Sequence, residues 1–216
     1  KETGTEVESI PLAGDASSRR YCRAVQGENS FVLMIWEPFN ENDSKYPFLS
    51  VLRHMAEHQV QVPKVITTNP ELGLILLEDL GDLTLERKFW ENQNQEHVLP
   101  FYKQAIDELL KIHYPCTSHK SSCTAFDIAF DTDKLLWEMN YGREQLIEKF
   151  CQVDLTAGES KELDRIFLDI CQKLDREDKY ICHRDYHSRN LMIKLGQMRV
   201  IDFQDARMGP IQYDLV

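Results

Sequence analysis

The apolar positions in the first 80 residues form short runs of the kind that build strands. Three runs lie within residues 7–37, separated by turn residues, and two more lie at residues 62–66 and 72–78. Residues 47–58 differ, because their apolar side chains recur every three or four positions and so mark one face of a helix. The pattern predicts a small antiparallel sheet accompanied by one helix.

After residue 83 the apolar spacing becomes helical over most of the chain. The predicted helices cover residues 99–113, 132–150 and 159–174. Because the strands come first and the helices follow, this order favours an α+β protein with two lobes. We expect an N-terminal sheet lobe over residues 1–80 and a helical C-terminal lobe over residues 81–216.

The residues best suited to catalysis gather toward the end of the chain. A short loop carries Asp185 and Asn190, and apolar residues on both sides of Gly196 predict a β-hairpin that ends at Asp202. Phosphoryl transfer needs a carboxylate that orients the acceptor hydroxyl and oxygen ligands that hold Mg²⁺ on the phosphates. We therefore predict Asp185 as the catalytic residue, and Asn190 and Asp202 as metal ligands.

Two other interpretations of this loop fit the sequence less well. A solvated loop would also carry acidic residues, but it would not need a hairpin beside it. His183 and His187 have a spacing that binds zinc when both side chains lie on one face of a helix. The residues around Asp185 indicate a loop instead, so we expect His183 to brace that loop by hydrogen bonds.

The motifs resemble the aminoglycoside phosphotransferase and choline kinase superfamily, the small-molecule relatives of protein kinases. The resemblance includes a Gly-Pro pair at residues 209–210 and Tyr-Asp-Leu at residues 213–215. More narrowly, residues 14–21, 76–81 and 202–206 resemble bacterial kinases that phosphorylate N-acetylmuramate and N-acetylglucosamine at C1. The resemblance implies a bilobal protein-kinase-like fold, ATP and Mg²⁺ as cofactors, and transfer of the γ-phosphate to the anomeric hydroxyl of an amino sugar. An aminoglycoside kinase, a choline-type kinase and a nucleotide-binding pseudokinase are the alternatives.

The resemblance also implies where a nucleotide would bind. In relatives, backbone groups where the two lobes join bind the edge of the adenine ring. The resemblance therefore implies that Glu78 and Leu80 contact the adenine. Gly14, Ser17 and Ser18 stand where a protein kinase covers the phosphates with a glycine-rich loop, and small residues there permit close approach.

The usual phosphate-binding lysine is missing from the third predicted strand, where Met34 takes its place. Charge on the transferred phosphoryl group must be offset by a preorganised cation. Arg19 and Arg20 follow the glycine turn, and an arginine fork matches phosphate geometry. Either arginine could supply the charge, and we assign Arg20 to the nucleotide site.

Composition narrows the partners that the protein can have. The net charge of −11 and the lack of a basic stripe argue against a nucleic-acid partner. No apolar run approaches the roughly 18 residues that a membrane span needs, and six cysteines without a Cys-x-x-Cys pair indicate free thiols in a reducing cytoplasm. We expect a small-molecule acceptor and a C-terminal lobe that is incomplete at Val216. Nothing in the sequence indicates an oligomeric state.

Overall fold

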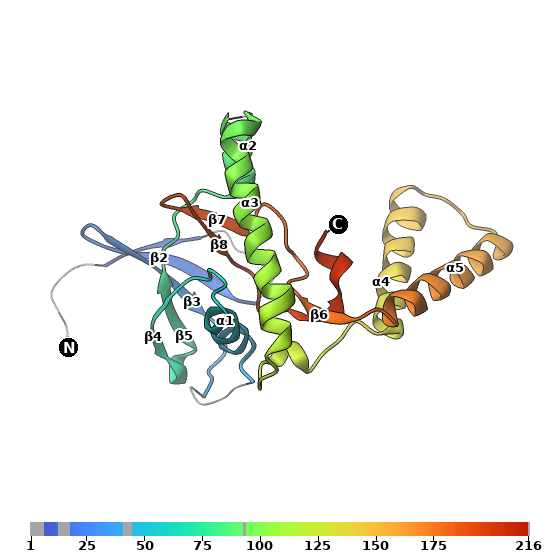
Figure 1. The fold of residues 1–216 in the computed structure, drawn as a ribbon, viewed down its shortest axis with the longest axis horizontal. Helices are drawn as coiled ribbons and strands as arrows, with labels where there is room; N and C mark the ends of the chain where they lie inside the picture. Colours follow the sequence, from blue (N-terminus) through green and yellow to red (C-terminus); the bar gives the residue numbers. More distant parts are fainter. Residues whose placement is uncertain (1–6, 13–17, 41–44, 93, 216) are drawn as a thin grey trace.

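The computed structural model describes residues 7–12, 18–40, 45–92 and 94–215. Its N-terminal part is a five-stranded antiparallel sheet in the order β1-β2-β3-β5-β4 (Figure 1). The strands are β1 (Glu8–Pro11), β2 (Arg20–Gln26), β3 (Asn29–Ile35), β4 (Val65–Asn69) and β5 (Leu74–Glu78). The predicted antiparallel sheet is therefore confirmed.

Helix α1 (Pro47–Glu57) accompanies this sheet, as the apolar spacing of residues 47–58 predicts. Pro47 suits the first turn of the helix. Proline lacks a backbone N–H group, and at this position that group would have no partner inside the helix. The helix buries an apolar face against the sheet. The core residues shared by α1 and the central strands are Phe48, Leu49, Leu52, Met55, Met34 and Ile75.

Two strands begin later than their apolar runs. The run at residues 62–66 becomes a strand only from Val65, because Pro63 has no backbone N–H to offer a neighbouring strand. The run at residues 72–78 starts inside a 3₁₀ turn, Pro70–Leu72, which ends at Gly73. Gly73 has φ of +64°, a left-handed conformation that glycine adopts without strain.

The helices after the sheet form two pairs. They are α2 (Leu85–Asn92), α3 (Gln95–Lys111), α4 (Thr132–Gly142) and α5 (Ala157–Asp175). The α2–α3 pair lies beside the C-terminal strands, and the α4–α5 pair projects away from the sheet (Figure 1). The helix expected at residues 132–150 is an α-helix only as far as Gly142, and Arg143–Phe150 continue it as a π-helix. The helix expected at residues 99–113 likewise ends in a π-helical turn, Ile112–Cys116.

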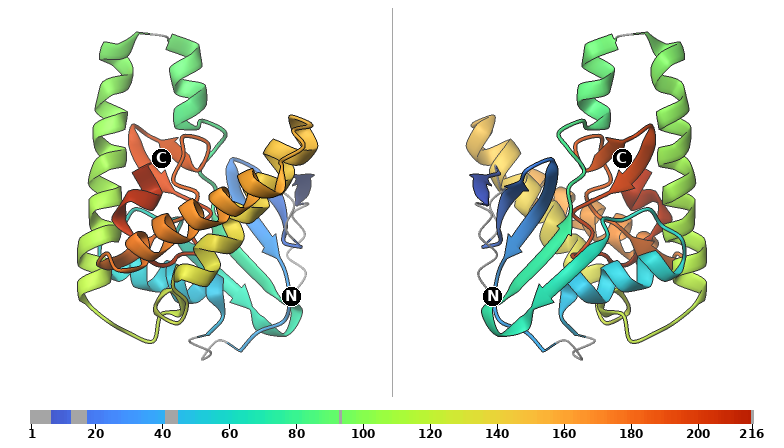
Figure 2. Two further views of the ribbon diagram at one scale, coloured as in Figure 1. Left: turned by 90° about the vertical axis from the view of Figure 1, so that its right-hand side faces the viewer. Right: turned by 90° about the vertical axis from the view of Figure 1, so that its left-hand side faces the viewer.

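Two small antiparallel sheets complete the fold. The strands are β6 (Lys179–Cys182), β7 (Leu191–Lys194), β8 (Gln197–Val200) and β9 (Arg207–Pro210), and the final turn η5 covers Ile211–Leu215. β7 and β8 form the predicted hairpin around Gly196, and β6 pairs with β9. This C-terminal segment lies between α3 and the N-terminal sheet in both views of Figure 2. It places the loops at residues 183–190 and 201–206 beside the sheet.

Within the described ranges, no helix combines the length and the apolarity that a membrane crossing requires. The α+β class, with an antiparallel N-terminal sheet and a largely helical remainder, is confirmed.

Candidate active site

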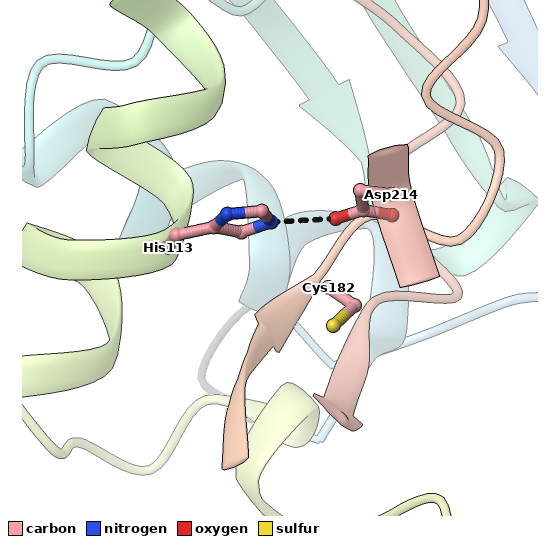
Figure 3. Close-up of side chains that lie close together, drawn as sticks. All are labelled: His113, Cys182 and Asp214. Atoms are coloured by element: carbon pink, nitrogen blue, oxygen red, sulfur yellow. Dashed lines mark hydrogen bonds and ion pairs between the residues drawn. The ribbon is translucent and has the colours of Figure 1, made fainter. Parts of the chain in front are cut away.

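The carboxylate of Asp214 holds the loop that joins β6 to β7. It accepts hydrogen bonds from the backbone N–H groups of His183 and Arg184, each at 2.8 Å, and it lies 2.9 Å from Nε2 of His113 (Figure 3). Arg184 has φ of +83°, a conformation that costs about 1 kcal/mol or more for a residue with a side chain. The charge-assisted hydrogen bonds from the two N–H groups offset that strain and fix the loop.

His113, Cys182 and Asp214 lie close enough together to be considered as metal ligands (Figure 3). The hydrogen bonds already described, however, engage both oxygens of Asp214. Burial raises the pKa of the Cys182 thiol, which favours the protonated form, and Sγ lies 3.4 Å from the carbonyl oxygen of Pro210. The cluster is therefore best explained as the support of the loop.

Two aromatic side chains hold the rest of this loop. His183 is fully buried, and its Nε2 lies 2.9 Å from the carbonyl oxygen of Ile201. Burial lowers the pKa of His183, so the neutral ring donates that bond. The hydroxyl of Tyr186 donates to the carbonyl oxygen of Ala105 in α3 at 2.5 Å. Asp185 lies between His183 and Tyr186 in the sequence, and it is exposed to solvent.

Asn190 and Asp202 lie side by side at the base of the β7–β8 hairpin. Asn190 donates through Nδ2 to the carbonyl oxygen of Asp185 at 3.0 Å and lies 3.5 Å from Oδ2 of Asp202. Oδ1 of Asn190 has no hydrogen-bond partner among the described residues, so it can bind a ligand. Gln204 donates to Oδ1 of Asp202 at 2.9 Å and to Asp205 at 3.0 Å. Amide and carboxylate oxygens are the donors that Mg²⁺ prefers, so this pair fits such an ion.

A cleft of about 540 Å³ joins these residues to the N-terminal sheet. Its volume lies in the range that small-molecule and cofactor sites occupy. One wall comes from the sheet and includes Tyr21, Val32 and Leu77, and the hinge at residues 78–82 forms one end. The opposite wall comes from the C-terminal strands and loops, namely Arg189, Asn190, Met192, Ile201, Asp202, Phe203 and Asp205. The cleft thus connects the predicted base-binding hinge to the predicted metal ligands.

Ion pairs fix the hinge at both sides. Nζ of Lys194 in β7 binds Oε1 of Glu78 at 2.9 Å and the carbonyl oxygen of Asp79 at 2.8 Å. Burial raises the pKa of Glu78, but Lys194 and the backbone N–H of Lys64 outweigh it, and the net pKa lies below the ordinary value. Arg23 in β2 binds Asp79 through Nε at 2.7 Å and Asp82 through Nη2 at 2.8 Å. The backbone N–H of Glu78 also donates to the carbonyl oxygen of Lys64 at 2.8 Å, so Glu78 has only its backbone carbonyl oxygen to offer a base.

The structure brings Arg19, and not Arg20, to the predicted metal ligands. Nη2 of Arg19 lies 3.9 Å from Oδ1 of Asp202 and 3.9 Å from Oδ2 of Asp205, and only 11% of its side chain is exposed. Arg20 is exposed at the start of β2, opposite Ile35, and does not line the cleft. Adjacent residues of an extended chain point in opposite directions, which separates the two side chains. The assignment of Arg20 to the nucleotide site therefore lacks a geometric basis.

Only some of the other predicted nucleotide contacts line the cleft. Gly14 and Ser17 lie outside the described residues. Ser18 is exposed and accepts a hydrogen bond from Nε1 of Trp36 at 2.9 Å, and it does not line the cleft. Glu78 and Leu80 both line it. No local motif points to Lys194 or Arg23, because their partners are far away in sequence.

The chain matches the phosphotransferase enzyme family over residues 8–216, and it belongs to this family. It is 31% identical to the N-acetylmuramate/N-acetylglucosamine kinase of Neisseria meningitidis serogroup B, over 94% of this chain and 58% of that protein. It is 30% identical to the kinase of the same name from Pseudomonas aeruginosa, over 97% of this chain and 58% of that protein. The chain thus spans less than two thirds of the length of these relatives. The resemblance seen in the sequence motifs is confirmed.

Solved structures agree with the fold. The ADP-bound aminoglycoside phosphotransferase APH(2'')-Ib superposes with a TM-score of 0.61 at 17% identity, over 98% of this chain and 70% of that one. A choline/ethanolamine kinase family protein from Mesorhizobium loti gives a TM-score of 0.60 at 17% identity, over 99% of this chain and 63% of that one. At this level of identity the likeness establishes the protein-kinase-like fold.

Proposed function

We propose that the protein is an ATP-dependent small-molecule kinase that phosphorylates the anomeric hydroxyl of an amino sugar. The observation that carries the proposal is the position of Asn190 and Asp202, adjacent to each other in a cleft that also contains the hinge. The relatives at about 30% identity, which are named N-acetylmuramate/N-acetylglucosamine kinases, support the choice of acceptor. Two lobes meeting near residue 80 are part of the same proposal.

Each residue of the site has one task in this proposal. The backbone of Glu78 and Leu80 binds the base, and Asn190 and Asp202 hold Mg²⁺ through their oxygens. Bound Mg²⁺ neutralises charge on the β- and γ-phosphates. Arg19 supplies the remaining positive charge, since Met34 is fully buried in the core and carries none. Asp185 orients the acceptor hydroxyl and accepts its proton.

The fixed loop explains how Asp185 can act in this way. The backbone on both sides of Asp185 is held, by Asp214 before it and by Asn190 after it. A carboxylate held in place orients a hydroxyl without losing further conformational entropy in the reaction. Its exposure leaves room for an acceptor.

A nucleotide-binding pseudokinase is the second candidate, and the buried Met34 at the lysine position favours it. Turnover separates the two. We would measure ADP release from Mg·ATP by the full-length natural protein with N-acetylmuramate, N-acetylglucosamine, kanamycin and choline as acceptors. We expect release with the two amino sugars that is lost in Asp185→Asn. If ADP is released only with kanamycin or choline, the acceptor is not an amino sugar. ATP binding without turnover would favour the pseudokinase.

A further inference from the structure

Two arginines beside the catalytic loop are not explained by the phosphoryl-transfer site. Arg184 directly precedes Asp185, and Arg207 opens β9 opposite Cys182 in the register of β6 and β9. Arg184 follows Cys182 by two residues, so this register brings the two arginines near each other. Burial lowers the pKa of Arg207, and the charge of Arg184 lowers it further.

Neither guanidinium has an ion-pair partner among the described residues. Nε of Arg184 is buried without any hydrogen-bond partner in the described part of the chain. Nε of Arg207 reaches only the carbonyl oxygen of Asp205, at 3.5 Å, and its guanidinium lies 5.3 Å from the centre of the Phe130 ring. Arg23, by contrast, engages two carboxylates. Two adjacent cations lacking such partners stand out in a chain whose net charge is −11.

Asp205 and Glu138 lie near Arg207 and raise its pKa, but neither forms an ion pair with it in the described part of the chain. Glu138 in α4 accepts a hydrogen bond from the hydroxyl of Tyr213 at 3.1 Å and pairs with Lys134 at 3.4 Å. Tyr213 also lies within the electrostatic influence of Arg184 and Asp185, which places all these groups in one region; burial and Glu138 raise the pKa of Tyr213 to about 12. Two guanidinium groups that lack an ion-pair partner in the described part of the chain therefore lie next to the carboxylate that receives the acceptor.

We propose that Arg184 and Arg207 bind a carboxylate of the acceptor and thereby make the enzyme prefer an acidic amino sugar to a neutral one. The inference rests on the proposed function and adds the residues that discriminate between acceptors. A guanidinium fork matches the two oxygens of a carboxylate, and a bound anion removes the repulsion between the two arginines. N-acetylmuramate carries a lactyl carboxylate, and N-acetylglucosamine lacks one. A neutral acceptor offers neither guanidinium a carboxylate partner.

The test compares the two sugars in one protein. In Arg207→Gln of the full-length natural protein, the ratio of kcat/KM for N-acetylmuramate to that for N-acetylglucosamine should fall by about tenfold or more. Arg165→Gln is the matched control, because Arg165 is an exposed arginine of α5 that pairs with Glu162; its ratio should equal that of the unaltered protein. The unaltered protein should also use N-acetylmuramate about tenfold or more better than the neutral methyl ester of that sugar.

The outcomes separate this inference from the proposed function. Turnover of both sugars with the same ratio in Arg207→Gln overturns the inference alone. Equal losses on both sugars also overturn it, since the arginines would then serve the transferred phosphate or the fold. Equal use of the acid and the methyl ester overturns it without any substitution in the protein. If the protein phosphorylates neither sugar, the proposed function fails together with the inference.

Discussion

Positive charge at the phosphate site is the central question at the scale of single residues. Met34 is fully buried, paired with Tyr21 on one side and Ile75 on the other, so it belongs to the core. A phosphoryl group in transfer carries negative charge that must meet fixed cations. Arg19 reaches the two acidic residues Asp202 and Asp205 from the sheet side. In the proposed site the cation thus comes from a different segment than the strand position where protein kinases carry a lysine.

This placement predicts different effects for two neighbouring arginines. Arg19→Ala should raise the KM for ATP and lower kcat/KM by about tenfold or more, which corresponds to roughly 1.4 kcal/mol of lost transition-state stabilisation. Arg20→Ala should have a smaller effect, because Arg20 is exposed outside the cleft. Steady-state kinetics with ATP varied at saturating acceptor measures both. A larger loss in Arg20→Ala would return the assignment to that residue.

At the scale of elements, the hinge is a point where distant segments meet. Lys194 comes from the β7–β8 hairpin, and Arg23 comes from β2, and both bind the short segment after β5. The two clamps hold the backbone of residues 78–82, where a base would bind. Hydrogen bonds to charged partners contribute about 1.5–3 kcal/mol each when well shielded from solvent, and less at the surface.

The Lys194–Glu78 clamp predicts a pH-dependent stability. The folded-state pKa of Glu78 is depressed, so its contribution is present above the unfolded pKa of about 4.3 and is lost as the pH falls through the folded value. Lys194→Met should therefore lower the free energy of unfolding by about 1 kcal/mol near neutral pH. The difference from the unaltered protein should shrink in acid, as measured by urea unfolding.

The control for this clamp is a surface pair. Lys173→Met removes the exposed ion pair with Asp169 on α5, and it should change stability little at either pH. An equal effect of the two substitutions, or a Lys194→Met effect that persists undiminished in acid, would contradict the assigned role of Glu78.

These contacts also mark the limit of what the sequence could predict. The sheet, the β7–β8 hairpin and helix α1 follow from local apolar spacing and turn residues, so their patterns predicted them. Asp185, Asn190 and Asp202 belong to one local motif, which made them visible as a group, although their roles stay predictions. The choice between Arg19 and Arg20 depends on which side chain faces Asp202. The contacts of Lys194 and Arg23 join segments that are distant in the sequence, so a local sequence pattern could not predict them.

At the scale of the whole molecule, the two halves of the chain share one hydrophobic core. The core cluster combines Met34 and Leu49 of the N-terminal part with Val200 and Phe203 of the C-terminal part. The rings of Phe48 and Phe203 lie 5.3 Å apart, and Phe203 directly follows Asp202. The proposed boundary near residue 80 thus crosses a continuous core, so a ligand in the cleft should stabilise the molecule as one unit.

Mg·ATP should accordingly raise the melting temperature of the protein. A ligand that binds only the folded state adds about 2.7 kcal/mol at a concentration one hundred times its Kd. Asp202→Asn removes a charge from the metal site while keeping its shape, so the stabilisation by Mg·ATP should fall. Stabilisation by ATP with excess EDTA should change much less, because the hinge and Arg19 remain. Thermal melts of the unaltered protein and of Asp202→Asn, each with Mg·ATP and with ATP plus EDTA, measure these four stabilisations. Equal stabilisation of the two proteins by Mg·ATP would show that Asp202 does not hold the ion.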